Sequence, residues 1–423
     1  RSLCGDLRRT GGESSGMLPE FIVSIDLGSE RTSVLVGEVI SGGTFKIIGA
    51  SSRPSSGIRK GAVVDMEEAA RCVRETADHA ARMAGVEIDC LCVGITGPHI
   101  RSFNSRGMIP VPRDRREITA ADVEHVNNIA CNITLPSEME ILHSIPQDYV
   151  VDAHKGISDP VGMTAARLGT EVHLISVQAV HVENAVKVIE KAGLEVVNVI
   201  FNPVAAAHAV LLDEEIEAGC LLIDMGACVS SFALYGNGSI RSSGVLGAGG
   251  ENVTNDLAVG LRIPKGTAEE VKLRWGLALA SLAPDEEVIT VPGTGEGEGE
   301  IRRQIIAAIM EPRCEEIFSM IKSAVSNDPH FQAAGSTVVL TGGGSKIEGL
   351  EGVAEQVFDR PVRTGRPHGL DGLSEIVSNE SWSSSVGLLL FEKDRLEREE
   401  QLVRGRGRIG KMLGNLKRIA GMF

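Results

Sequence analysis

The chain contains the same strand-and-turn pattern in each of its halves. An apolar run ends in an aspartate, a glycine follows two positions later, and a second apolar strand leads to a glycine-containing hairpin turn. The matching residues are Asp26, Gly28 and Ser33 in the first copy and Asp224, Gly226 and Ser231 in the second. Repetition of one such unit across two halves predicts a duplicated domain.

A third apolar strand, residues 338–340, runs into the glycine-rich segment 341–345. We expect a helix to begin near Lys346 and to direct backbone N–H groups toward the α-phosphate and ribose of a nucleotide. In the two aspartate turns, glycine allows backbone N–H groups to approach phosphate oxygens, and the aspartates can hold Mg²⁺ through water. The order of the three motifs is typical of the actin, Hsp70 and sugar-kinase clan. It predicts an α/β fold with two lobes around a nucleotide cleft.

Several segments resemble the FtsA family within that clan. They are residues 25–31 with 36–39, 94–100 with 102–104, 311–313, and 340–343. The resemblance extends over nearly all of Phe21 to Phe423. It implies an actin-like, ribonuclease H-like duplicated fold in which a subdomain called 1C replaces the 1B subdomain of actin.

The resemblance and the composition together predict the boundaries along the chain. We expect a disordered extension over 1–18, with Met17 as a candidate start, and a charged linker over 392–405 before an amphipathic helix over 406–423. The expected subdomains are 1A over 19–102 and 182–214, 1C over 103–181, 2A over 215–249 and 331–391 with a closing helix, and 2B over 250–330.

The expected ligand is ATP with Mg²⁺, and the metal is expected to be held through water by Asp26 and Asp224. By resemblance, Gly249, Gly250, Glu269 and Lys272 flank the ribose and adenine. For the last two, a plain surface ion pair at i, i+3 is the alternative. The full set of candidate nucleotide residues is Asp26, Gly28, Ser29, Arg31, Asp224, Gly226, Gly249, Gly250, Glu269, Lys272, Gly342, Gly343, Gly344 and Ser345.

Two departures from the clan predict slow or negligible ATP hydrolysis. The second phosphate turn usually reads Asp-x-Gly-Gly-Gly-Thr, but here Ala227, Cys228 and Val229 follow Gly226. Asn202 stands where relatives that hydrolyse well often carry a glutamate, and an amide can orient a water but cannot act as a general base.

The C-terminal residues form an amphipathic pattern with basic and no acidic residues from Arg404 onward. An apolar stripe flanked by positive charge is typical of a helix that lies in the membrane interface. The alternatives are packing on the chain's own domain and binding in a partner's groove. The candidate membrane residues are Arg408, Ile409, Lys411, Met412, Leu413, Leu416, Arg418, Ile419 and Phe423.

Composition excludes several other classes. The net charge of −15 and the aromatic content of 3% argue against a nucleic-acid binder. The eight cysteines have no zinc-ligand spacing and are expected to be free thiols in a reducing cytosol. No segment has the roughly 20 apolar residues of a membrane-spanning helix, and the N-terminus lacks the apolar run of a signal peptide.

The resemblance implies a cell-division adaptor at the cytoplasmic face of the membrane, at the septum. Such a protein binds ATP, can polymerise head to tail, binds other division proteins and ties the FtsZ ring to the membrane. Arg313 and Glu316 are the candidate contacts of the FtsZ C-terminal tail, with merely solvated charges as the alternative. The competing hypotheses for the whole chain are a PilM-type scaffold of pilus assembly and a phosphotransferase of the sugar- or acetate-kinase type.

Overall fold

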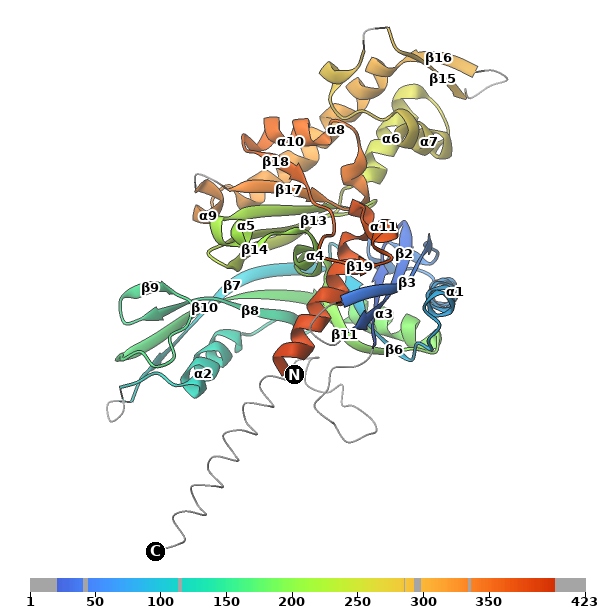
Figure 1. The fold of residues 1–423 in the computed structure, drawn as a ribbon. Coiled ribbons are helices and arrows are strands. Elements are labelled where there is room, and N and C mark those ends of the chain that lie inside the picture. The colour runs from blue at the N-terminus through green and yellow to red at the C-terminus, as the bar shows by residue number, and fades with distance from the viewer. Residues whose placement is uncertain are drawn as a thin grey trace, which may run out of the picture.

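The computed structural model describes residues 21–40, 45–112, 116–284, 286–292, 298–333 and 336–399. The expected extension over 1–18 and the amphipathic helix over 406–423 lie outside these residues. The described chain forms two lobes that each contain a central sheet, with one further subdomain attached to each lobe (Figure 1).

The first lobe is built on a six-stranded sheet with helices on both faces. The helices α1 (Met66–Ala84) and α3 (Ala179–Lys191) pack together on one face. Side chains alternate along a strand, so Cys92 faces the other side and packs against Leu388 and Ala205. Across the sheet the strands are β11 (Glu195–Phe201), β6 (Cys90–Ile95), β1 (Phe21–Leu27), β2 (Arg31–Val39), β3 (Phe45–Pro54) and β19 (Asp371–Gly372), and a small hairpin of β4 (Ile58–Arg59) and β5 (Ala62–Val63) lies beside it.

The second lobe repeats the central part of the first. Its sheet has the order β14 (Ser239–Leu246), β13 (Ser230–Gly236), β12 (Cys220–Met225), β17 (Thr337–Thr341) and β18 (Val362–Thr364). Strand β12 lies between antiparallel β13 and parallel β17, as β1 lies between antiparallel β2 and parallel β6. Asp26 pairs with Ser33 in the first lobe, and Asp224 pairs with Ser231 in the second. The predicted duplication is therefore present in the same register.

Short elements connect these sheets and complete the second lobe. They are α4 (Asn202–Val210), α5 (Asp213–Ala218), α9 (Pro329–Gln332), η3 (Gly343–Lys346), α10 (Leu350–Phe358), α11 (Ser374–Val377) and η4 (Glu380–Trp382).

The inserted subdomain lies in the range expected for 1C. One helix, α2 (Ala120–Cys131), packs on a sheet of β7 (Ile100–Pro110), β10 (Arg167–Gln178), β8 (Met139–Val151) and β9 (His154–Ile157). Thr119 and Asp122 form a reciprocal capping box that satisfies free N–H groups at the start of α2.

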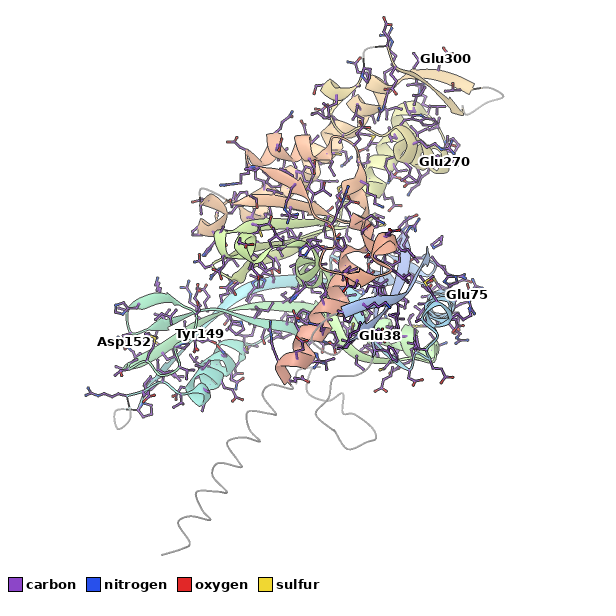
Figure 2. The ribbon with its side chains drawn as sticks, viewed as in Figure 1. Glu38, Glu75, Tyr149, Asp152, Glu270 and Glu300 are labelled. Atoms are coloured by element: carbon purple, nitrogen blue, oxygen red, sulfur yellow. The ribbon has the colours of Figure 1, made fainter. Side chains whose placement is uncertain are left out.

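A helical subdomain lies in the range expected for 2B. Its elements are α6 (Gly250–Leu261), α7 (Lys265–Trp275), η2 (Ala280–Leu282), β15 (Val288–Pro292), β16 (Glu298–Arg302) and α8 (Arg303–Val325). Glu270 and Glu300 mark this subdomain in Figure 2, and Tyr149 and Asp152 mark the inserted subdomain at the opposite end of the molecule.

A last helix over 383–399, called the C-terminal helix below, crosses the middle of the molecule (Figure 1, red). We expected residues 392–405 to be a linker, but 392–399 continue this helix. Ion pairs at i, i+3 and i, i+4 link Glu392 to Arg395 and Arg395 to Glu399, so the charges stabilise the helix rather than ending it. Within the described ranges, no helix is both long and apolar enough to span a bilayer.

Candidate nucleotide-binding site

A cavity of about 620 Å³ lies between the lobes, where the two aspartate turns and the glycine-rich segment meet. All but two of the candidate nucleotide residues line it. Of the two exceptions, Gly249 lies directly behind the wall, because a Cβ on it would be 2.6 Å from the Gly226 carbonyl oxygen. The Ser345 hydroxyl donates a hydrogen bond to the Gly342 carbonyl within the third loop.

Asp26 ends β1 at the floor of the cavity. The Asn202 Nδ2 amide donates a hydrogen bond of 2.9 Å to the Asp26 Oδ1 atom. Burial raises the pKa of Asp26 to about 7, the hydrogen bond from Asn202 opposes that shift, and the Asp224 carboxylate adds to it. The first turn therefore presents a carboxylate whose negative charge lacks compensation, which is a site suited to a cation.

Asp224 occupies the equivalent position in the second lobe. The Ser384 hydroxyl donates to its Oδ2 atom at 2.8 Å, and burial raises the pKa of Asp224 against the effect of this bond. Gly342 approaches from the third loop with φ of 84°, and a Cβ there would be 2.2 Å from the Asp224 Oδ1 atom. Only glycine fits this contact, because both the backbone angle and the space exclude a side chain.

The turn after β12 is held against the start of α6. The Gly250 and Glu251 N–H groups donate to the carbonyls of Gly226 and Ala227. The Cys228 thiol donates a hydrogen bond to the Glu251 Oε2 atom. Burial is the main cause that raises the pKa of this thiol, and the neighbouring Glu251 carboxylate raises it further. A protonated, largely buried thiol thus stands in this turn at the position of the last glycine of the usual clan motif.

The glycine-rich segment does not lead directly into an α-helix. Residues 343–346 form the 3-10 turn η3, and α10 begins only at Leu350. The expected helix start near Lys346 is therefore wrong, because Gly349 takes the left-handed conformation with φ of 79° between the two elements. Gly343, Gly344 and Lys346 still line the cavity.

Lys272 and Glu269 form an ion pair on the cavity wall. The Lys272 Nζ atom also donates to the Gly250 carbonyl and to the Thr254 hydroxyl, and the lysine side chain is 10% exposed. Lys272 therefore links α7 to α6 from a largely buried position. The alternative of a plain surface ion pair, in which the lysine is solvated, does not describe it.

Two buried polar atoms on the cavity wall have no partner in the described structure. They are the Thr96 Oγ1 and Asn202 Oδ1 atoms. A buried oxygen left without a hydrogen bond is costly, so both atoms fit a wall that receives water or a polar ligand. No group of three or more His, Cys, Asp or Glu residues that could hold a metal by itself occurs in the described ranges.

The sequence analysis missed part of the lining. Ser384, Trp382, Arg274 and Lys346 line the cavity, and so do Arg303 and Glu348, which pair with each other. Lys346 directly follows the glycine-rich segment, whereas the other residues belong to segments without a motif and reach the cavity through tertiary packing, so no local pattern signals them.

Comparison with known proteins identifies the family. A family model described as "Cell division protein FtsA" matches residues 221–387, and one described as "SHS2 domain inserted in FTSA" matches residues 97–176. The cell division protein FtsA of Pseudomonas aeruginosa is 38% identical over 373 residues, which cover 88% of this chain and 89% of that protein. The chain belongs to the FtsA family of cell division proteins.

FtsA of Escherichia coli strain K12 is 35% identical over 385 residues, which cover 89% of this chain and 91% of that protein. Among solved structures, a chain of the PilM–PilN type IV pilus biogenesis complex has a TM-score of 0.64, 16% identity and coverage of 88% and 98%. MreB5 of Spiroplasma citri bound to ADP has a TM-score of 0.55, 15% identity and coverage of 90% and 99%. The structural likenesses confirm the actin-like fold, and the FtsA relatives place this fold in cell division.

Proposed function

We propose that this FtsA-family chain is an ATP-binding adaptor that ties the FtsZ ring to the cytoplasmic face of the membrane at the septum. The observation that carries the proposal is the convergence of Asp26, Asp224 and Gly343 on one cavity between duplicated lobes. Two acidic turns and a glycine-rich loop around one cavity suit a triphosphate with its cation.

Asp26 and Asp224 would hold Mg²⁺ through water, and the bound ion would supply neutralisation of phosphate charge. The glycines at 28, 226, 342 and 343 leave room for phosphate oxygens beside the backbone. Arg274, Lys272 and Lys346 add positive charge along the wall of the cavity. These residues bind and orient the nucleotide, and ligand binding draws the two lobes together.

We expect slow ATP hydrolysis because neither Asn202 nor Cys228, which line the proposed phosphate site, can act as a general base. The Asn202 Nδ2 group donates its hydrogen bond to Asp26. The Asn202 Oδ1 atom, which has no partner among the described residues, can accept a hydrogen bond from water but cannot take a proton from it at neutral pH. Cys228 hydrogen bonds to Glu251 and is protonated at neutral pH. We therefore propose a nucleotide-regulated adaptor with slow or negligible ATPase activity.

The partner surfaces are further parts of the proposal. Closed molecules can polymerise head to tail, and other division proteins are expected on the inserted subdomain. For the FtsZ tail, Arg313 and Glu316 lie on α8, where Arg313 also pairs with Asp256 of α6. Any carboxylate of the FtsZ tail would therefore have to compete with Asp256 for the guanidinium of Arg313. The basic amphipathic segment over 406–423 is the proposed membrane contact.

Sedimentation with anionic liposomes tests the adaptor proposal. The full-length chain and a chain stopped at Gln401 are compared with and without Mg·ATP and purified FtsZ. We expect the full chain to carry FtsZ into the pellet and the shortened chain to leave FtsZ in the supernatant. Equal pelleting of FtsZ by both chains would refute a membrane tether in the C-terminal segment.

A further inference from the structure

Two helices cross at the centre of the molecule, and each begins beside one of the two carboxylates. The first residue of α4 is Asn202, which donates to Asp26. In the first turn of the C-terminal helix, Ser384 donates to Asp224. Because the lobes are duplicated, Ser384 is the structural counterpart of Asn202 on the second lobe.

The two helices touch through their backbones. A Cβ on Gly387 would lie 2.0 Å from the carbonyl oxygen of Ala205 in α4, so only glycine permits this approach. Leu388 packs with Ala205 in the same buried cluster. If the start of the C-terminal helix moves, α4 must move with it, because closely packed elements move as rigid bodies rather than deform.

The start of the C-terminal helix is attached to both lobes. The Thr341 hydroxyl of the second lobe hydrogen bonds to Ser383 at 2.6 Å, and the Ser24 hydroxyl of the first lobe donates to the Ser385 carbonyl at 2.9 Å. Ser383 and Ser385 are fully buried. At the floor of the cavity, Ser383 thus contacts the second lobe, Ser384 contacts Asp224, and Ser385 contacts the first lobe.

The middle of the same helix packs on the first lobe and the inserted subdomain. The Phe391 ring packs edge-on against His143 of β8 and His208 of α4. Asn198 of β11 donates to the buried Glu392 carboxylate at 2.9 Å. A helix over 383–399 spans roughly 25 Å at its usual rise per residue, so it connects the cavity directly with the residues that precede the C-terminal segment.

We propose that Ser384 is a positioning residue for Asp224 and that the C-terminal helix transmits ligand binding in the cleft to the second half of the helix, residues 391–399. This inference rests on the proposed function, because it takes Mg·ATP as the ligand of the cavity. A ligand that draws Asp224 toward a cation moves Ser384 with it. The displaced helix start then shifts Phe391 against the inserted subdomain and Glu392 against β11, ahead of the proposed membrane segment.

The test compares full-length wild type, Ser384→Ala and Ser384→Thr by hydrogen exchange and calorimetry. The matched control is Ser378→Ala, because Ser378 is exposed and its hydroxyl donates to the Glu375 carbonyl, away from the cavity lining. In wild type and control, we expect saturating Mg·ATP to slow amide exchange over 391–399 by about threefold or more. In Ser384→Ala, this change should disappear and the affinity for Mg·ATP should fall by about tenfold, with affinity for metal-free ATP nearly unchanged. Ser384→Thr keeps the hydroxyl and should restore both.

The outcomes separate this inference from the proposed function. If wild type binds Mg·ATP in the calorimeter but exchange over 391–399 does not respond, the transmission is refuted and the nucleotide site remains. If Ser384→Ala responds like wild type, Ser384 does not position Asp224. If wild type binds no nucleotide, the proposed function fails and the inference fails with it.

Discussion

Asp26 is partly buried at the floor of the cleft, where loss of contact with water raises its pKa to about 7, and the Asp224 carboxylate contributes to the rise. An unfolded aspartate loses its proton near pH 3.9, so between about pH 4 and pH 7 the folded chain holds a proton that the unfolded chain has released. The free energy of unfolding therefore falls as pH rises through this window. In the proposed complex with Mg·ATP, the same negative charge on Asp26, which lowers the stability of the free protein, would attract the cation.

Asp26→Asn should stabilise the nucleotide-free protein at pH 8 by about 1–2 kcal/mol, because it removes a carboxylate that must ionise in a buried site and that solvent in the cleft only partly screens. The gain should shrink toward pH 4. Chemical denaturation at pH 5 and pH 8 measures it, with Asp78→Asn on the exposed face of α1 as the control. A variant that is less stable than wild type at both pH values would contradict this account of Asp26.

The same titration predicts the pH dependence of binding. A protonated Asp26 does not attract Mg²⁺, so the affinity for Mg·ATP should fall by about tenfold between pH 8 and pH 6, as the carboxyl gains its proton near pH 7. Calorimetry at both pH values measures this, and titration with metal-free ATP corrects for protonation of the nucleotide itself. An unchanged affinity for Mg·ATP after that correction would argue against Asp26 as a contributor to the metal site.

At the scale of elements, the turn after β12 and the start of α6 form one unit. The N–H groups of Gly250 and Glu251 bond to carbonyls of the turn, and Gly249 lets the two backbones approach. This unit lies directly behind the turn after Asp224, which we propose to receive a phosphate. Its geometry decides whether the turn can receive a phosphate.

Gly249→Ala should weaken Mg·ATP binding by more than about tenfold, because its Cβ would lie 2.6 Å from the Gly226 carbonyl and would push the turn into the cavity. Gly247→Ala is the matched control, since a Cβ there meets no atom within 4 Å. Calorimetry on both variants, with circular dichroism to verify folding, gives the comparison. Equal loss of affinity in the two variants would show that general loosening, rather than the contact with Gly226, is responsible.

The sequence predicted those parts of the fold that local patterns encode. The Asp26 and Asp224 turns were recognisable because strand, aspartate and glycine follow each other within a few residues. The structure adds that these aspartates pair with Ser33 and Ser231 on the neighbouring strands. The bond from Ser384 to Asp224 joins distant segments and leaves no local trace. Residues 392–399 were misjudged because charges that pair along a helix have the same composition as a charged linker.

At the scale of the whole molecule, the inserted subdomain is bound to the second lobe by buried polar contacts. Gln147 donates to the Ile240 carbonyl on the edge strand β14, and the His173 ring bonds to Asn104 and Ser243. Burial lowers the pKa of His173 to about 4, so the ring is neutral in this contact. The subdomain that the chain inserts into the first lobe is thus held by the second as well.

Arg241→Ala should separate the inserted subdomain from β14 and should cost about 2–4 kcal/mol, because the arginine is almost fully buried and pairs with Asp148. Thermal unfolding measures the loss, and hydrogen exchange should locate increased opening in β7 and β8. Arg106→Ala is the control, as its pair with Glu171 is exposed on the same subdomain. A loss of less than about 1 kcal/mol would show that this contact does not hold the two parts together.

The convergence of both aspartates on one bound cation is tested most directly by titrating ATP into wild type, Asp26→Asn and Asp224→Asn, each with and without Mg²⁺. The account predicts that Mg²⁺ tightens ATP binding to wild type by about tenfold or more, that either substitution removes most of this gain, and that binding of metal-free ATP changes little. If both variants kept the full effect of Mg²⁺, the two turns would not share a cation, and the account of the cleft would be wrong.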